Sequence, residues 1–506
     1  MTPPNVLLIM TDQQRFDTIR SLGNGIIHTP NIDRLVARGT AFTNAYSPCP
    51  VCIPARYVVQ SGGEPTRTRV YSNATPAGVH EAIARECGPW LASTMAELGY
   101  RTWGIGKFHT VPWDAPLGYE VQLYSEEFYE SPAQRGADSY AAWIAREHPE
   151  YDWVEMLMGE RTDMYYVPQL SPLPPELTVE WWAARRAADQ IASPDPRPYF
   201  GFVSFIGPHP PFAPPQPFNR LYDPDRMPDP ILGDLAVDHM DEQIPYMNHL
   251  VFAEDISAAT ARQLKARYYG EISYIDHCVG AILDAVEARP DADNTLIAFF
   301  TDHGDHLGDH HGWQKESFFE ASTRIPLLVS WPARWPGGGR RDATLASLTD
   351  IFGLCTGAAG APQPRDGVDL VARLDGSAAG REELYGFWGK PGQNNFKMML
   401  RTGDWKLIWL ANGGRTQLFD VRRDPHERHE RSAEQPQLLD RLLRRCGDRL
   451  LADGLDAALA DGLPRAQEWR AWPRQRIYQF DASRGVTGFP EDPGAALRAF
   501  AERSRP

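Results

Sequence analysis

Residues 49–61, which read CPVCIPARYVVQS, combine a thiol, a helix start and a cation in a short segment. Pro54 is typical of the first turn of a helix, which places Cys52 just before the helix N-terminus. The unpaired amides there, together with the cation of Arg56, stabilise an anion and lower the pKa of a thiol. The segment therefore favours an anion site or a thiol of lowered pKa at Cys52. Two plainer interpretations are a buried structural cysteine and a redox pair with Cys49, since one C-x-x-C alone is weak evidence for zinc.

Other residues that suit catalysis follow short apolar runs. Runs without polar alternation, which predict strands buried on both faces, lie at 5–10, 101–105, 199–205, 296–300 and 325–331. Four of these runs lead into residues that bind metals or anions or transfer protons: Asp12 and Gln13, Lys107 and His109, His209, and Asp302 and His303. Because the carboxyl ends of parallel strands meet at one edge of a sheet, we expect these side chains to share a site.

The elements that must position these residues predict an α/β fold. The clearest helical period covers 260–288, and strands that alternate with helices indicate a large, mostly parallel sheet sandwiched by helices. Proline and glycine crowd 207–217, which predicts a loop, and 331–380 predicts a loop-rich connection.

The C-terminal part predicts a smaller α+β unit. Residues 397–410 indicate a two-strand hairpin around Gly403 and Asp404, and 417–421 indicate another strand. We therefore expect a catalytic α/β domain over 1–380 and a smaller α+β subdomain over 381–506.

Composition excludes several classes of protein. The 506 residues are 42% apolar and 23% charged, which is the ordinary globular mixture, and the net charge of −15 disfavours nucleic acid and anionic membranes as partners. Six cysteines are too few for a disulfide framework in a chain of this length, and no segment is typical of a signal peptide or a membrane span. These features predict a cytoplasmic protein.

The string Cys52-Ile53-Pro54-Ala55-Arg56 resembles the C-x-P-x-R signature of the sulfatase family. Further strings follow in family order: NVLLIMTDQ at 5–13, TPNIDRLVARG at 29–39, GKFH at 106–109, PHPP at 208–211, TDHG at 301–304 with Lys315, and DWKLI and LFDVRRDPHE in the C-terminal part. The resemblance implies an alkaline-phosphatase-like fold, a superfamily that also includes phosphonate monoester hydrolases.

That resemblance implies that a maturation enzyme oxidises Cys52 to formylglycine, whose hydrate attacks the sulfur of a small anionic ester. It also implies one divalent metal, with ligands carried over to Asp12, Gln13, Asp302 and His303. Three of the four offer oxygen, which favours Ca²⁺ and leaves Mn²⁺ or Mg²⁺ open, since histidine at 303 replaces an asparagine common in the family.

The resemblance further implies that a set of cations surrounds the ester. Arg56, Lys107 and Lys315 would hold the sulfate oxygens, and His109 would help hold the diol. His209 is the candidate that protonates the leaving oxygen, with support from Lys315.

Other candidates rest on weaker patterns. Asp305, His306, Asp309, His310 and His311 could form a second metal site, but we favour hydrogen-bonded support and a substrate rim for this run. Substrate contacts are assigned to Asn73, His310 and Trp313. Together with Trp313, the aromatic pair Trp181-Trp182 and Trp388 could stack on sugars, although such residues are more often core.

Three functions remain open at this point. The first is a sulfatase, which hydrolyses a sulfate monoester. The second is a phosphonate monoester or phosphodiester hydrolase with the same formylglycine, which the Gly-Lys-x-His string disfavours, and the third is a thiol redox protein that uses Cys49 and Cys52. The sequence does not identify the sulfated molecule, and it leaves a homo-oligomer open.

Overall fold

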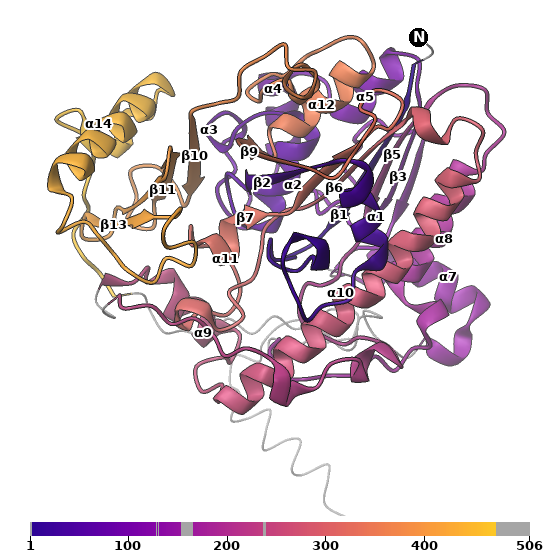
Figure 1. Ribbon diagram of the computed structural model, residues 1–506, viewed down its shortest axis with the longest axis horizontal. Helices are drawn as coiled ribbons and strands as arrows, with labels where there is room; N and C mark the ends of the chain where they lie inside the picture. Colours follow the sequence, from indigo (N-terminus) through magenta and orange to yellow (C-terminus); the bar gives the residue numbers. More distant parts are fainter. Residues whose placement is uncertain (1–2, 128, 130, 153–164, 236–238, 472–506) are drawn as a thin grey trace, which may run out of the picture.

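The computed structural model describes residues 3–127, 129, 131–152, 165–235 and 239–471 (Figure 1). Within this part of the chain, the main element is a nine-stranded sheet. Its strands are β1 (Asn5–Thr11), β2 (Thr40–Tyr46), β3 (Arg101–Gly106), β4 (Val121–Tyr124), β5 (Tyr199–Ser204), β6 (Thr295–Thr301), β7 (Arg324–Ile325), β8 (Leu327–Ser330) and β9 (Arg340–Ser347).

The strands that carry the predicted site lie side by side. The order is β4-β3-β5-β1-β6-β8-β2-β7, with β9 paired to β2. Neighbours from β4 to β6 are parallel, whereas β8 is antiparallel to β6. The carboxyl ends of β3, β5, β1 and β6 therefore meet at one edge, as the sequence predicts.

The prediction of a single strand at 325–331 is wrong, because the segment contains two strands, β7 and β8, separated by Pro326. Proline has no amide hydrogen and so cannot donate the hydrogen bond that a continuous strand needs at this position.

Two layers of helices cover the sheet. The helices are α1 (Pro30–Arg38), α2 (Cys52–Ser61), α3 (Pro65–Thr68), α4 (Val79–Cys87), α5 (Leu91–Glu97), α6 (Pro132–Ala137), α7 (Ser139–Glu147), α8 (Val179–Ile191), α9 (Gln243–Leu250), α10 (Ala258–Glu287), α11 (Glu320–Thr323), α12 (Asp350–Ala358), α13 (Leu370–Leu374) and α14 (Pro436–Ala452). Side chains of α2, α4, α5 and α12 pack on one face, and those of α1, α7, α8 and α10 pack on the other. Strand β1 is buried on both sides, with Val6 and Leu8 in the first layer and Leu7 and Ile9 in the second.

The predicted loop-rich connection over 331–380 is only partly correct. It contains β9, α12 and α13. Strand β9 begins RRDAT, and these residues are exposed or half-buried, so its apolar pattern is too weak to predict a strand. The loop predicted at 207–217 contains no helix or strand.

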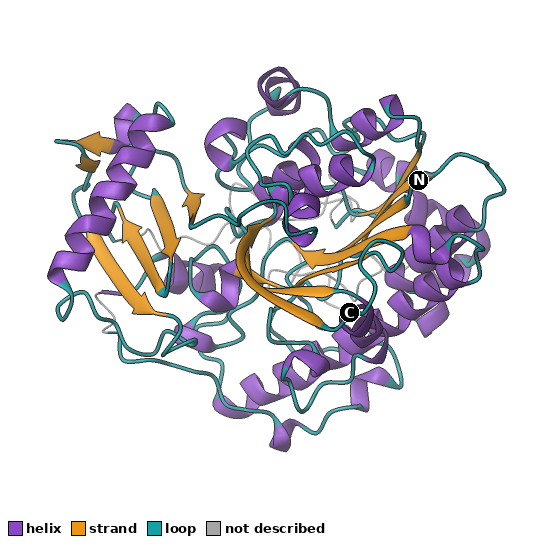
Figure 2. Cartoon of the chain, turned by 45° about the horizontal axis from the view of Figure 1, so that its top comes forward, coloured by secondary structure: helices purple, strands orange, loops and turns teal. Residues whose placement is uncertain are grey.

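A second, antiparallel sheet forms the C-terminal part (Figure 2). Its strands are β10 (Glu383–Trp388), β11 (Lys397–Thr402), β12 (Trp405–Leu410) and β13 (Arg415–Asp420), and β14 (Leu459–Ala460) pairs separately with β15 (Leu463–Pro464). The predicted hairpin is confirmed as β11 and β12. One face of this sheet packs on α14, and the other face packs on Phe318 and Phe319, which precede α11. The predicted domain boundary at 380 stays a prediction.

No described helix combines the length and apolar character required to cross a bilayer.

Candidate active site

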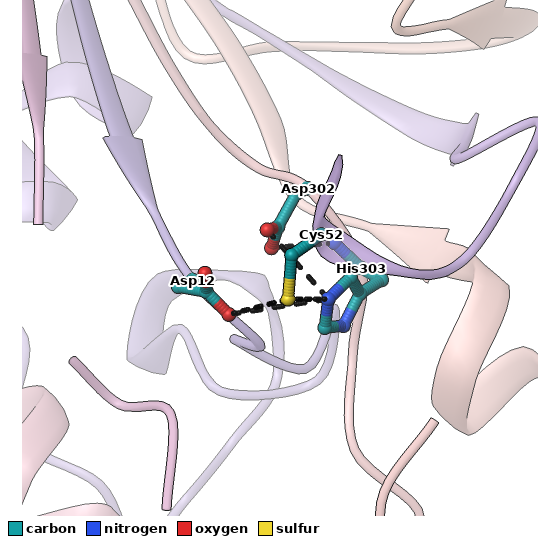
Figure 3. Close-up of side chains that lie close together, drawn as sticks. All are labelled: Asp12, Cys52, Asp302 and His303. Atoms are coloured by element: carbon teal, nitrogen blue, oxygen red, sulfur yellow. Dashed lines mark hydrogen bonds and ion pairs between the residues drawn. The ribbon is translucent and has the colours of Figure 1, made fainter. Parts of the chain in front are cut away.

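Four predicted side chains converge beyond the carboxyl ends of β1 and β6. Asp12 follows β1, Asp302 and His303 follow β6, and Cys52 is the first residue of α2. One ligand atom from each lies within 4.8 Å of the others, and all four side chains are buried (Figure 3). Each comes from a segment remote from the others in sequence except the adjacent pair at 302 and 303, so the sheet creates the cluster.

The two carboxylates in the cluster have opposite electrostatic environments. Asp12 Oδ2 accepts hydrogen bonds from Arg56 Nη2 at 2.9 Å and from Lys107 Nζ at 2.7 Å. Burial opposes its ionisation, but the nearby cations hold the pKa of Asp12 well below its usual range. Burial and the charge of Asp12 raise the pKa of Asp302 to about 7.

The donor set fits a divalent cation. Asp302 Oδ2 is buried without a hydrogen bond, although Arg56 Nε lies 3.4 Å away. Burial and Lys315 hold the pKa of His303 well below its ordinary value, so its imidazole is neutral, as a metal ligand must be. A divalent cation would satisfy the unpaired carboxylate oxygen and remove the like-charge penalty between the two acids.

Gln13 lies beside this cluster. Its backbone N–H donates to Asp302 Oδ1 at 3.0 Å, and its side-chain Oε1 accepts from Lys315 Nζ at 2.7 Å. Its φ of 68° is in the left-handed region, a strained conformation for this residue type that the contacts with Asp302 and Lys315 hold in place. The side-chain amide of Gln13 therefore bridges Lys315, through Oε1, and Asp305, through Nε2, beside the metal-ligand cluster.

The thiol of Cys52 points into the cluster. Its Sγ lies 3.3 Å from His303 Nε2 and 3.3 Å from Lys315 Nζ. Burial and Asp12 raise the pKa of this thiol despite Lys315, so the predicted lowering of the pKa is wrong. The physical reason is that burial and the charges of Asp12 and Asp302 outweigh the nearby cations Lys315 and Lys107. Cys49, whose thiol lies 3.7 Å from the carbonyl of Tyr71, is free like Cys52.

Arg56 and Lys107 form a cationic wall. Arg56 Nη1 donates to the carbonyl of Lys107 at 2.6 Å and to Ser204 Oγ at 2.8 Å. Gly106, with φ of 114°, ends β3 where a Cβ would overlap the carbonyl oxygen of Ser204. Glycine therefore allows the strand to turn and deliver the fully buried Lys107 to Asp12.

His209 and Lys315 form a second pair. His209 Nδ1 lies 2.8 Å from the carbonyl of Pro210, and its Nε2 lies 2.7 Å from Lys315 Nζ. A carbonyl accepts only, so Nδ1 carries a hydrogen and Nε2 is the atom that faces the site. Tyr165 stands edge-on to this imidazole, with 5.8 Å between ring centroids.

His109 lies at the edge of the same group. Its φ of 53° is in the left-handed region, and its backbone N–H donates to Glu126. Burial, Lys107 and Arg56 hold the pKa of His109 well below its ordinary value. Its Nδ1 is buried without a hydrogen bond, 4.0 Å from Glu127 Oε2.

Sequence reasoning missed Glu126 and Glu127. Glu126 accepts the N–H groups of Phe108 and His109, and Glu127 forms an ion pair with Lys107. Both follow β4, a half-buried four-residue strand that no apolar run announces. Identification of that strand would have placed both carboxylates at the same sheet edge as the other site residues.

The run of Asp and His from 302 to 311 does not form a second cluster. Among the described residues, the only groups able to hold a metal are the one around Asp302 and a trio of Cys52, Glu127 and His209. Of the other candidates in the run, Asp305, His306, Asp309 and His310 have protein partners, whereas His311 is exposed. Asp305 accepts hydrogen bonds from Gln13 and Tyr166, and Asp309 pairs with Arg15.

The three predicted substrate contacts lie outside the cluster. Asn73 Oδ1 accepts the N–H of Ile53 at 3.0 Å and so caps the helix that carries Cys52. His310 stacks on Phe319 with 4.0 Å between centroids, and Trp313 packs in a buried apolar cluster.

The other aromatic candidates have protein partners. Trp181 stacks on His277, Trp182 is buried in the core, and Trp388 lies beneath Lys397.

Comparison with protein families gives two overlapping matches. The family described as Sulfatase matches residues 4–361, and the family described as N-sulphoglucosamine sulphohydrolase, C-terminal, matches residues 308–446.

Known proteins agree with this assignment. An arylsulfatase of Clostridium perfringens (strain 13 / Type A) is 27% identical over 84% of this chain and 89% of its own. A choline-sulfatase of Rhizobium meliloti (strain 1021) is 30% identical over 84% of this chain and 81% of its own. The solved phosphonate monoester hydrolase of Agrobacterium radiobacter shares the fold, with a TM-score of 0.73, 24% identity and coverage of 92% of this chain and 99% of that one. The chain belongs to the sulfatase family.

Proposed function

We propose that the protein hydrolyses a sulfate monoester to an alcohol and inorganic sulfate, with residue 52 as the nucleophile. The observation that carries this proposal is the placement of Cys52 Sγ. It lies beside two carboxylates and a neutral histidine and 3.3 Å from the Nζ of Lys315. A thiol whose pKa is raised is a poor nucleophile, so the site suits a modified residue better than a free cysteine.

The chemistry requires two groups that the chain would acquire. Hydrated formylglycine at position 52 would supply a hydroxyl nucleophile, and a divalent ion would lower the pKa of that hydroxyl and offset the charge of the sulfuryl oxygens. Asp12, Gln13, Asp302 and His303 would hold that ion, and the oxygen-rich set favours Ca²⁺ over Mn²⁺ or Mg²⁺.

The side chains of the chain itself bind and orient the ester. Arg56, Lys107 and Lys315 offset the negative charge on the sulfuryl oxygens, and the buried setting strengthens each contact. In its cationic form, in which both Nδ1 and Nε2 carry a hydrogen, His209 donates the Nε2 proton to the leaving oxygen, and Lys315, whose Nζ lies 2.7 Å from Nε2, supports this transfer. His109, which is neutral, holds the nucleophile as a hydrogen-bond partner.

The test combines modification, metal content and turnover. Peptide mass spectrometry on protein made with a formylglycine-generating enzyme should find the aldehyde at Cys52, and elemental analysis should find one divalent ion per chain. That preparation should hydrolyse 4-nitrophenyl sulfate, whereas protein with the unmodified thiol should not. A free thiol at full occupancy together with full activity would refute the proposal.

A second candidate is a phosphonate monoester or phosphodiester hydrolase. Sulfate monoesters and phosphate diesters both present a singly charged tetrahedral centre, so the residues of the site barely discriminate between them, and two solved phosphonate monoester hydrolases share the fold. Parallel initial rates on an aryl sulfate and an aryl phosphonate monoester decide between the two. A much larger kcat/KM for the phosphonate would reverse the ranking. The redox candidate receives no support, because Cys49 and Cys52 are free and contact different groups.

The last part of the proposal concerns the cellular location of the protein and its protein partners. We propose a cytoplasmic location, which six free cysteines support, and a maturation enzyme as the obligatory protein partner.

A further inference from the structure

The carboxylate of Glu127 lies beside Lys107, His209 and Cys52, the group of side chains that we call the anion-binding nest. Its side chain is 3% exposed, and it forms an ion pair with the buried Lys107. Its Oε1 lies 3.4 Å from His209 Nε2, and one carboxylate oxygen lies within 4.8 Å of Cys52 Sγ. A negative charge therefore sits as close to the nucleophile position as the oxygens of a bound ester must come.

We propose that Glu127 is a specificity-determining residue that selects singly charged esters against doubly charged ones. The inference rests on the proposed function, because it concerns the ester that the same site accepts. It names the substrate class as monoanionic tetrahedral esters, which include sulfate monoesters and phosphate diesters, and excludes dianionic phosphate monoesters.

The argument is electrostatic. The repulsion between the carboxylate of Glu127 and a bound ester grows in proportion to the charge of the ester. One additional charge at about 5 Å, at an effective dielectric constant of about 20, changes binding by roughly two orders of magnitude. The ion pair with Lys107 reduces this effect, and we therefore expect about tenfold or more discrimination, which corresponds to about 1.4 kcal/mol.

The contacts of Glu127 differ from those of a carboxylate that only supports the fold. Its neighbour Glu126 is also buried, but it accepts the backbone N–H groups of Phe108 and His109. Removal of the charge at Glu126 would disturb the turn and lower turnover of every ester alike. Removal of the charge at Glu127 would instead change the ratio between esters of different charge.

The experiment measures kcat/KM at about pH 8, above the second pKa of a phosphate monoester at about 6. The esters are 4-nitrophenyl sulfate, methyl 4-nitrophenyl phosphate and 4-nitrophenyl phosphate, the last of which is a dianion. In E127Q we expect the ratio of the dianion to the sulfate to rise about tenfold or more, and the ratio of the diester to the sulfate to stay unchanged. E127D, which keeps the charge, should keep the wild-type ratio, and E126Q should lower all three rates by a common factor.

Each other result overturns the inference. An unchanged ratio in E127Q, with sulfate still hydrolysed, rejects the role of Glu127 alone. A lower metal content in E127Q than in the wild type shows that Glu127 is a metal ligand, since Cys52, Glu127 and His209 are close enough to hold an ion. Failure of the fully modified wild type on all three esters rejects the proposed function and the inference with it. E127A provides the same neutralisation should E127Q fold poorly.

Discussion

Asp138 gives the sharpest prediction about stability near the site. Its carboxylate is buried, caps α7 by accepting the N–H of Ala141 at 2.9 Å, and accepts the N–H of Glu126 at 2.8 Å. Burial raises the pKa of Asp138 to about 7, despite those hydrogen bonds. Since Glu126 holds the turn at His109, this acid lies two hydrogen-bonded steps from the nest.

The sign of the pH dependence follows from the direction of this shift. Between the ordinary value of 3.8 and about 7, the folded protein keeps a proton on Asp138 that the unfolded chain has lost. Stability from this group is therefore complete below the lower value and falls as the pH rises through about 7. At about 1.4 kcal/mol per pH unit, the loss is about 4 kcal/mol in full and about 3 kcal/mol between pH 5 and pH 8.

The assay compares the wild type with D138N in urea at about pH 5 and about pH 8. Asparagine cannot ionise, so the free energy of unfolding of the wild type minus that of D138N should fall by about 3 kcal/mol across this range. Other titrating groups are common to both proteins and cancel in the difference. Asp369 caps α13 in the same way but is partly exposed, and D369N is the matched control for loss of a capping carboxyl group. A difference for D138N that is independent of pH would refute the reasoning.

Three further predictions concern the site. Replacement of Cys52 by alanine should abolish turnover and leave the thermal midpoint within a few degrees of the wild type, because the side chain is small; measurable activity in C52A would remove the nucleophile assignment. Replacement of Asp302 by asparagine should reduce the divalent-ion content found by elemental analysis, because it removes a buried anionic donor, and an unchanged ion content would contradict the ligand assignment. Replacement of Asn73 by alanine should lower the free energy of unfolding in urea by about 1 kcal/mol, because the N–H of Ile53 loses its acceptor. N73D, which keeps an acceptor oxygen, is the matched control, and equal stability of N73A and the wild type would show that the cap is dispensable.

Local pattern was sufficient for the parts of the fold that are buried on both sides. The strands that end at Asp12, Lys107 and Asp302 are uninterrupted apolar runs, and parallel pairing leaves one edge where their following residues meet. The fold class and the convergence of most site residues could thus be predicted before any coordinates. The roles of these residues came from resemblance and remain to be tested.

Strands with weak patterns were beyond local prediction. β4 is half-buried over four residues and β9 begins with charged residues, so neither carries a period that distinguishes it from a loop. The strand that pairs with β9 is β2, which is remote from β9 in the sequence. Strands of this kind form because an adjacent strand supplies partners for their backbone hydrogen bonds.

Electrostatics depended entirely on the tertiary structure. The sequence around Cys52 contains a helix start and Arg56, which by themselves favour a thiolate, yet the pKa of this thiol is raised because the fold buries it beside Asp12. Glu127 belongs to no recognisable sequence motif, and only its contacts with Lys107 and His209 in the folded structure indicate a role for it. The identity of the reactive residues lies in the chain, whereas their charge states depend on distance and burial, and only packing sets those two quantities.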